Sequence, residues 1–213
     1  MSYGYVGDTS TSIKQQVKNA GVLSVSDVLD LEGKGQLGGS LELIEEQTVS
    51  GVSSIVFDDL KENKYDVHLL QCIGLYASTS THINLRFSND NGSTFESSNY
   101  QYAIQYVGTN GSAGVIQSTT GTDITNLTSD NNNSTQAGGA YHYLYNLGNS
   151  SKYSFTTGQI MDGNTNLAGV FFTQFQGGVY TVAETINAFN LFATGATVTG
   201  TVKLYGVKQI WVT

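Results

Sequence analysis

Acidic side chains are the first candidates for chemistry, because cleavage of a glycosidic bond needs two carboxyl groups about 5 to 9 Å apart. The candidates are Glu45, Glu46, Asp58, Glu96 and Glu184. Nothing in their spacing marks such a pair, and the adjacent Glu45 and Glu46 would point to opposite faces of a strand. The chain also lacks a G-x-S-x-G nucleophile elbow. We therefore expect a protein that is not an enzyme.

The histidines and the single cysteine are the next reactive side chains. His68, His82 and His142 fall on different expected strands, and no two of them have the spacing of zinc ligands. Each ring is expected to pack and hydrogen-bond where it stands. Cys72 lies in the apolar run Val67–Leu75 without an activating neighbour, which predicts a buried, unreactive thiol.

Clusters of oxygen-bearing side chains raise the question of calcium, which binds such ligands. The clusters are Asp58-Asp59, Asn89-Asp90-Asn91 and Asp162-Gly163-Asn164. None has the spacing of a twelve-residue calcium loop. In a chain without proline, turns built on Asn and Asp are the expected explanation. No cofactor is expected, and the question of a bound calcium ion stays open.

The sharpest local pattern is an eight-residue stretch that reads SNDNGSTF. It resembles the Asp-box, S-x-D-x-G-x-T-W, in its residues Ser88, Asp90, Gly92, Thr94 and, in place of tryptophan, Phe95. Asn91 and Gly92 would supply the positive φ angles of a tight hairpin. Asp90 would accept hydrogen bonds from backbone N–H groups across the turn, and Phe95 would hold the hairpin against the core. The expected role of this pattern is structural.

Tyrosine is abundant, with thirteen residues, and its ring suits both sugar stacking and protein interfaces. Two expected strands carry tyrosines at alternate positions: Tyr100, Tyr102, Tyr106, Tyr141, Tyr143 and Tyr145. We expect most of these rings to pack in the core. On the second strand this would turn His142 and Leu144 to the opposite face.

The segments that would position these groups are typical of β-strands. Residues with β-branched and aromatic side chains gather in Leu41–Ile44, Val52–Phe57, Tyr65–Tyr76, Ile83–Phe87, Tyr100–Val107, Tyr141–Leu147, Tyr153–Thr157, Leu167–Phe175, Ile186–Phe192 and Val202–Val212. Turn residues separate these segments, and no long helical periodicity interrupts them. The pattern predicts an all-β protein, an antiparallel β-sandwich of jelly-roll type that occupies residues 40–213.

One polar segment, Ser129–Gly139, interrupts the expected strands and reads SDNNNSTQAGG. Loops at the end of a rigid sandwich are common sites of recognition. The segment is therefore a candidate recognition loop, with the residues Asn131, Asn132, Asn133, Ser134, Thr135 and Gln136.

Residues 1–39 differ in character from the rest of the chain. They show no sustained periodicity apart from a short helix expected at Val25–Leu31, with Ser24 as its N-cap. Several glycines follow as a flexible joint. We expect an extended N-terminal arm that attaches to a neighbouring subunit or to a larger particle through Val22, Leu23, Val25, Val28, Leu29 and Leu31.

The overall composition excludes several classes of partner. Charged residues make up only 12% of the chain, and the net charge is −8. An acidic protein without a basic cluster is a poor match for nucleic acid and for anionic membranes. No apolar run approaches the roughly 20 residues needed to span a bilayer, so no membrane insertion is expected.

Three stretches carry a resemblance to a known group of proteins. They read GVLSVSDVLDLEGKGQLGGSLELIEEQTVS, KENKYDVHLL and GTVKLYGVKQI. They are similar to small β-sandwich structural proteins of marine tailed phages, of the tail-fibre or decoration type. The resemblance implies a virion protein without catalytic residues.

Two functions follow as expectations from this resemblance. The first is a tail-associated fibre or receptor-binding component that attaches to the host surface, with a host-surface glycan as a candidate ligand. The alternative is a capsid decoration protein on the head. A polysaccharide-degrading enzyme ranks below both, because it needs a clustered pair of acids that the sequence does not show. In each virion role the partners would be other virion proteins and further copies of the chain, and the resemblance to phage appendages implies a trimer.

Overall fold

A computed structural model describes residues 29, 40–128, 133–164, 167 and 169–208 of the chain. Contacts between residues divide the chain into two compact parts, Met1–Leu41 and Glu42–Thr213. Apart from Leu41, the first residue of the first strand, all strands lie in the second part. The expected arm and its helix lie outside the described residues, with Leu29 as the exception. The side chain of Leu29 is exposed. The proposed role of the arm therefore stays a prediction.

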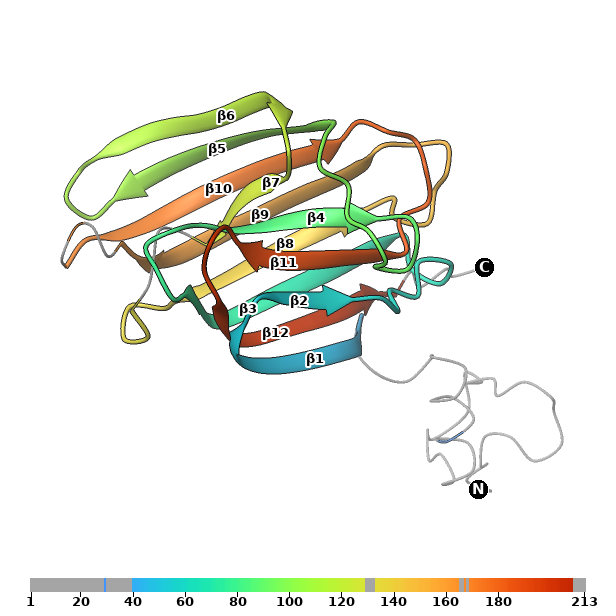
Figure 1. Cartoon of the computed structure of the whole chain (residues 1–213), viewed down its shortest axis with the longest axis horizontal. Coiled ribbons are helices and arrows are strands. Elements are labelled where there is room, and N and C mark those ends of the chain that lie inside the picture. Colours follow the sequence, from blue (N-terminus) through green and yellow to red (C-terminus); the bar gives the residue numbers. More distant parts are fainter. Residues whose placement is uncertain (1–28, 30–39, 129–132, 165–166, 168, 209–213) are drawn as a thin grey trace, which may run out of the picture. The chain divides into compact units, whose positions relative to one another are not determined.

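The described residues contain twelve strands: β1 (Leu41–Val52), β2 (Ser54–Phe57), β3 (Val67–Ala77), β4 (Ile83–Ser88), β5 (Tyr100–Gly108), β6 (Ala113–Gly121), β7 (Ile124–Thr128), β8 (Gly139–Tyr145), β9 (Ser154–Gly163), β10 (Phe171–Tyr180), β11 (Ala188–Ala193) and β12 (Val198–Val207). They form two sheets that face each other (Figure 1). The large sheet has eight strands in the order β1-β12-β3-β8-β9-β10-β5-β6, and the small sheet has four in the order β2-β11-β4-β7. Neighbouring strands run antiparallel. The expected all-β antiparallel sandwich is confirmed.

Alternation along the strands builds the core between the sheets. On β12, Val202 and Leu204 are fully buried, whereas Lys203 between them reaches the surface. The small sheet supplies the facing side chains, and Phe189 stacks on Phe57 with 5.0 Å between the ring centroids. Burial of such side chains is worth about 1.5–3 kcal/mol each. A strand shifted by one residue would lose this contribution, and the alternation therefore fixes the strand register.

Two strands in the middle of the chain, β6 and β7, were not expected from the sequence. Their sequences, AGVIQSTTG and ITNLT, are too polar and too rich in small residues to resemble buried strands. The hydroxyl of Thr125 and the amide nitrogen of Asn126 are nevertheless paired inside the sandwich, whereas the side-chain oxygens of Asn126 and Thr128 have no partner among the described residues. Asn126 donates a hydrogen bond to the side chain of Gln174, and Asn84 accepts one from Thr125. Pairing removes most of the cost of burying these groups.

The two tyrosine-bearing strands face in opposite directions. On β5 the tyrosines point inward as expected, and Tyr100 is fully buried with its ring 5.0 Å from that of Tyr180. On β8 the expectation is wrong, because His142 and Leu144 are buried and Tyr141 is exposed. Period-two alternation makes two faces distinguishable but does not say which one meets the core. Here the imidazole fits inside because the neighbouring strand offers a glycine opposite it, Gly158.

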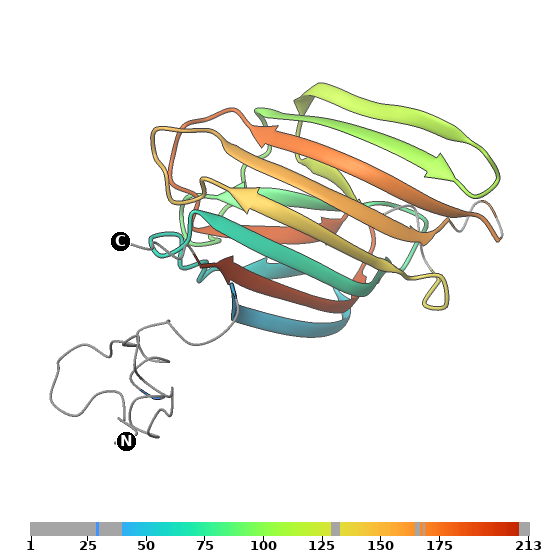
Figure 2. The same cartoon turned by 180° about the vertical axis from the view of Figure 1, so that it is seen from behind.

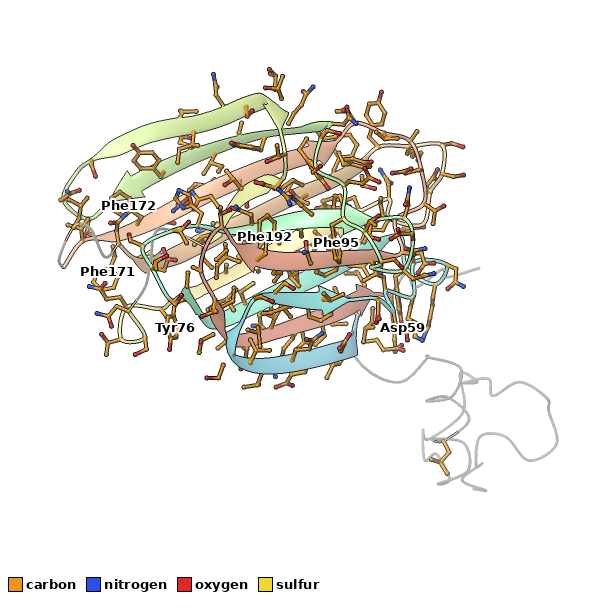
Figure 3. The ribbon with its side chains drawn as sticks, in the orientation of Figure 1. Asp59, Tyr76, Phe95, Phe171, Phe172 and Phe192 are labelled. Atoms are coloured by element: carbon orange, nitrogen blue, oxygen red, sulfur yellow. The ribbon has the colours of Figure 1, made fainter. Side chains whose placement is uncertain are left out.

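The outer surface of the small sheet is covered by the chain's own side chains and turns. Gly92, in the turn after β4, lies against Val56 and Ala188 on that surface. The guanidinium of Arg86 stacks on the ring of Phe192 at 4.5 Å. Figure 3 shows Phe95 and Phe192 over the strands of this sheet. The outer surface of the large sheet, seen from behind in Figure 2, carries exposed side chains instead.

Candidate binding face

The outer face of the large sheet is free of charge across six adjacent strands. These strands, β3, β8, β9, β10, β5 and β6, contain one Asp and no Glu, Lys or Arg. The Asp is Asp162, and it is buried on the inner side. We use the name outer face for the outward residues of these six strands. Surfaces of soluble proteins normally carry charges of both signs throughout, and a large neutral area is therefore a candidate for contact with a neutral partner.

A trough crosses one end of the outer face, and its floor is made by small residues. Gly177 on β10 pairs with Ala103 on β5 and with Thr157 on β9. A side chain at Gly177 would meet no atom within 4 Å, which shows how open the space above it is. The trough has a volume of about 760 Å³ and extends over β6, β5, β10 and β9.

The walls of the trough combine apolar surface with uncharged polar groups. Phe155 and Val179 supply the apolar part, and Phe155 keeps 43% of its surface exposed. Gln101 and Gln117 supply exposed side-chain amides that make no hydrogen bond to any other described residue. An amide both donates and accepts hydrogen bonds, and hydroxyl groups of Ser and Thr do the same. The trough can therefore bind a ligand with hydroxyl groups and an apolar face.

Beside the trough, a row of tyrosines on β8 continues the outer face. The rings of Tyr141, Tyr143 and Tyr145 follow one another at centroid distances of 6.2 and 6.3 Å. Two of their hydroxyl groups are held by β9, since Tyr141 donates to Gln159 at 3.0 Å and Tyr145 lies 3.2 Å from the hydroxyl of Thr157. These hydrogen bonds orient the rings of Tyr141 and Tyr145 along the outer face.

The Asp-box-like stretch forms a hydrogen-bonded turn at the other sheet. Asn91 and Gly92 have φ angles of 57° and 78°, as expected for the centre of the turn. The carboxylate of Asp90 accepts hydrogen bonds from the hydroxyl of Ser88 at 2.7 Å and from the N–H and hydroxyl of Thr94 at 2.9 and 2.7 Å. These bonds hold the pKa of Asp90 at about 2, below its usual value. The turn leads from β4 in the small sheet to β5 in the large one, so it does not join two paired strands.

The candidate recognition loop lies away from the trough. Asn131 and Asn132 fall outside the described residues. The remaining members form a turn in which the side chain of Asn133 accepts hydrogen bonds from the N–H and the hydroxyl of Thr135 at 3.0 and 2.7 Å. The carbonyl of Gln136 accepts from the N–H of Gly163, at the last residue of β9. The trough is at the opposite end of β9, where Phe155 stands.

The buried histidines and the cysteine are part of the core. His142 donates from Nε2 to the carbonyl of Leu127 at 3.3 Å, and burial lowers the pKa of His142 to about 4. His68 lies 2.7 Å from the carbonyl of Leu60 in the same way. Cys72 is fully buried, and burial raises the pKa of its thiol to about 12. The expected buried cysteine is confirmed.

None of the candidate catalytic carboxylates lines the trough. Glu46 forms an ion pair with Lys203 at 3.0 Å, and Glu184 accepts hydrogen bonds from the hydroxyl of Tyr180 and the amide of Asn89, both at 2.8 Å. Desolvation raises the pKa of Glu45. Within the described residues, no three His, Cys, Asp or Glu side chains are grouped in a way that could hold a metal ion. The same residues contain no helix long and apolar enough to cross a membrane.

Sequence reasoning missed the residues of the trough. Gly177 and Ala103 carry no functional groups, and only the sheet brings them side by side. One signal was present in the sequence, namely the near absence of charge from six strand segments. Comparison with known proteins adds nothing to this picture, because no family model, curated protein or solved structure matches the chain.

Proposed function

We propose that this chain is a non-catalytic structural protein of a tailed-phage virion, a tail-associated component that attaches to the host surface by binding a neutral glycan. The observation that carries the proposal is the uncharged trough over Gly177, with its exposed amides and its exposed aromatic ring. The phage context rests on the sequence resemblance alone. The site of action would be the surface of the particle.

The connection of the strands supports a jelly-roll fold, an arrangement that occurs in viral capsid and lectin domains. In a jelly roll, eight strands pair as a long folded hairpin, the first with the last and so on inward. The pairs β1 with β12, β2 with β11, β3 with β8 and β4 with β7 follow this nested order. The remaining strands form two hairpins, β5-β6 and β9-β10, that extend the large sheet beyond β8. These two insertions are the strands that build the trough.

The chemistry of the trough fits a sugar chain better than a charged ligand. Sugar rings present an apolar C–H face that stacks on aromatic rings, and Phe155 offers such a ring. Their hydroxyl groups pair with amides and hydroxyls, which Gln101, Gln117 and Thr157 provide. An anionic polysaccharide would find no cation in the trough and would be repelled by the net charge of −8.

The test is affinity electrophoresis of the purified chain in gels that contain neutral polysaccharides (dextran, mannan or galactan) or anionic ones (alginate or heparin). We expect retardation by at least one neutral polymer and by neither anionic polymer. Phe155→Ala should weaken the retardation about tenfold, since an aromatic contact of this kind contributes about 1–1.5 kcal/mol. Gly177→Leu should abolish it, because a side chain on the floor of the trough would keep a sugar ring from lying across Gly177.

The matched control is Phe175→Ala, which removes another exposed phenylalanine of the outer face but one that does not line the trough. Binding should survive this change. Retardation that Phe155→Ala and Gly177→Leu leave unaltered would refute a glycan site in the trough. The place in the particle is tested separately by cryo-electron microscopy of the intact virion: tens of copies at the tail support attachment, whereas hundreds on the head would make the chain a decoration protein.

A further inference from the structure

We propose that the outer face carries a self-association surface at the end opposite the trough, and that a second copy of this chain binds there about a two-fold axis. The surface, which we name the apolar patch, consists of Ile73, Val107, Val115, Met161, Phe171 and Phe175. None of these residues lines the trough. The inference is therefore independent of the proposed glycan site.

The apolar patch is unusual in how much of each large side chain is exposed. Val115 is 63% exposed and Phe175 54%, and the remaining members are between 37% and 48% exposed. They come from the adjacent strands β9, β10, β5 and β6 and from β3, which Gly139 of β8 separates from Met161 of β9. The uncharged Thr173, Gln105 and Gln159 stand between members of the patch, which neighbour one another diagonally across the sheet. Large apolar side chains gathered in this way on the surface of a soluble protein mark a candidate interaction site.

Charge favours another copy of the chain as the partner. Two copies carry a net charge of −8 each and repel each other over most of their surfaces. The outer face is the exception, because its six strands place no charge on it. Ion pairs gather elsewhere, at β1 and β12, where Glu42 and Glu46 meet Lys64 and Lys203. Two copies can thus approach at the apolar patch without bringing like charges together and without removing a charged group from water.

The area of the patch is sufficient for a specific contact. It crosses five strand spacings from β3 to β6, about 24 Å, and three side-chain rows about 7 Å apart along the strands. When the side chains at the edge of the patch are included, the area that would be buried is about 600 Å² per copy, or about 1,200 Å² for two copies. That is the lower limit of standard interfaces, so we expect a dimer that dissociates on dilution.

The position of the two-fold axis follows from the requirement that the second copy must not cover the trough. An axis that crosses the strands at Thr173 on β10 would stack the two sheets face to face and reverse their strand directions, as in aligned sheet packing. Phe175 of one copy then meets Phe171 of the other, since these residues stand one step on either side of Thr173. Figure 3 shows Phe171 at the beginning of β10. The two troughs lie at opposite ends of such a dimer.

The experiment is sedimentation equilibrium of the full chain at about 1–100 µM, the range in which an interface of this size associates. The mass should rise from 22.8 kDa towards twice that value. Phe175→Glu and Phe171→Lys should each remain monomeric, with dissociation constants raised at least 100-fold. Mixing these two variants should restore a dimer, because the introduced carboxylate would face the introduced ammonium across one half of the interface and two phenylalanines would meet in the other half.

Phe155→Glu is the matched control, since it places the same charge on the same face outside the patch, and it should dimerise like the natural chain. Circular dichroism and the unfolding midpoint verify that each variant is folded. A natural chain that stays monomeric, a trimeric mass, a Phe175→Glu variant that dimerises unchanged, or a mixture that fails to associate would each overturn the proposal. Glycan retardation of the Phe175→Glu monomer separates this proposal from the proposed function.

Discussion

Protonation of His142 should destabilise the fold as the pH falls below neutrality. The ring is fully buried between the sheets, and its Nε2 donates to the carbonyl of Leu127. Burial penalises the charged form and lowers the pKa to about 4, and the backbone hydrogen bond opposes this shift only in part. In the unfolded chain the pKa returns to about 6.5.

The magnitude follows from linkage between protonation and folding. The folded pKa lies below the unfolded one, so the unfolded state binds more protons between pH 6.5 and pH 4. Stability is therefore complete above pH 6.5 and is lost as the pH falls towards 4. With these two values the loss between pH 7 and pH 5 is about 1.8 kcal/mol, and the full loss is about 3.4 kcal/mol.

Urea unfolding of the natural chain and of His142→Leu at half-unit steps from pH 7.5 to pH 5 measures this effect. The variant loses one hydrogen bond at every pH, which lowers its stability by a constant amount. Its dependence on pH should be flatter by about 1.8 kcal/mol over the interval from pH 7 to pH 5. The pKa of His68 is also lowered by burial, but this residue is present in both proteins and cancels in the difference. Equal slopes in the two proteins would refute the argument.

Two further predictions concern the core. Gly158→Ala should destabilise the protein by about 3 kcal/mol, because the added methyl group would overlap the imidazole of His142 and the backbone beside it. Gly177→Ala, in the neighbouring strand, is the control, because the space above Gly177 is open. It should change the unfolding free energy by no more than about 0.5 kcal/mol. Equal effects of the two substitutions in urea unfolding would contradict this account. The buried thiol of Cys72 should resist a water-soluble disulfide reagent in the native protein and react with it within minutes in 6 M guanidinium. The absorbance of the released thiol follows the reaction. Rapid labelling of the native protein would count against burial of Cys72.

The sequence by itself determined the fold class and several local features. The alternation of apolar and polar residues, the many β-branched and aromatic side chains and the absence of helical periodicity predict antiparallel strands, because these patterns depend only on neighbouring positions. The buried Cys72 and the positive φ angles of Asn91 and Gly92 were predicted for the same reason. Their causes lie within a few residues of the chain.

Only the tertiary structure decided which strand face meets the core and which strands lie side by side. The tyrosines of β8 point outward because His142 can enter the core where Gly158 leaves room, and these residues are brought together by strand pairing. The strand β7 forms despite its polar sequence, because partners such as Asn84 and Gln174 come from distant segments. The trough and the apolar patch likewise depend on the pairing of β5 with β10, whose facing residues are more than sixty positions apart in the sequence. Such contacts have no signature in local sequence, since long-range pairing creates them.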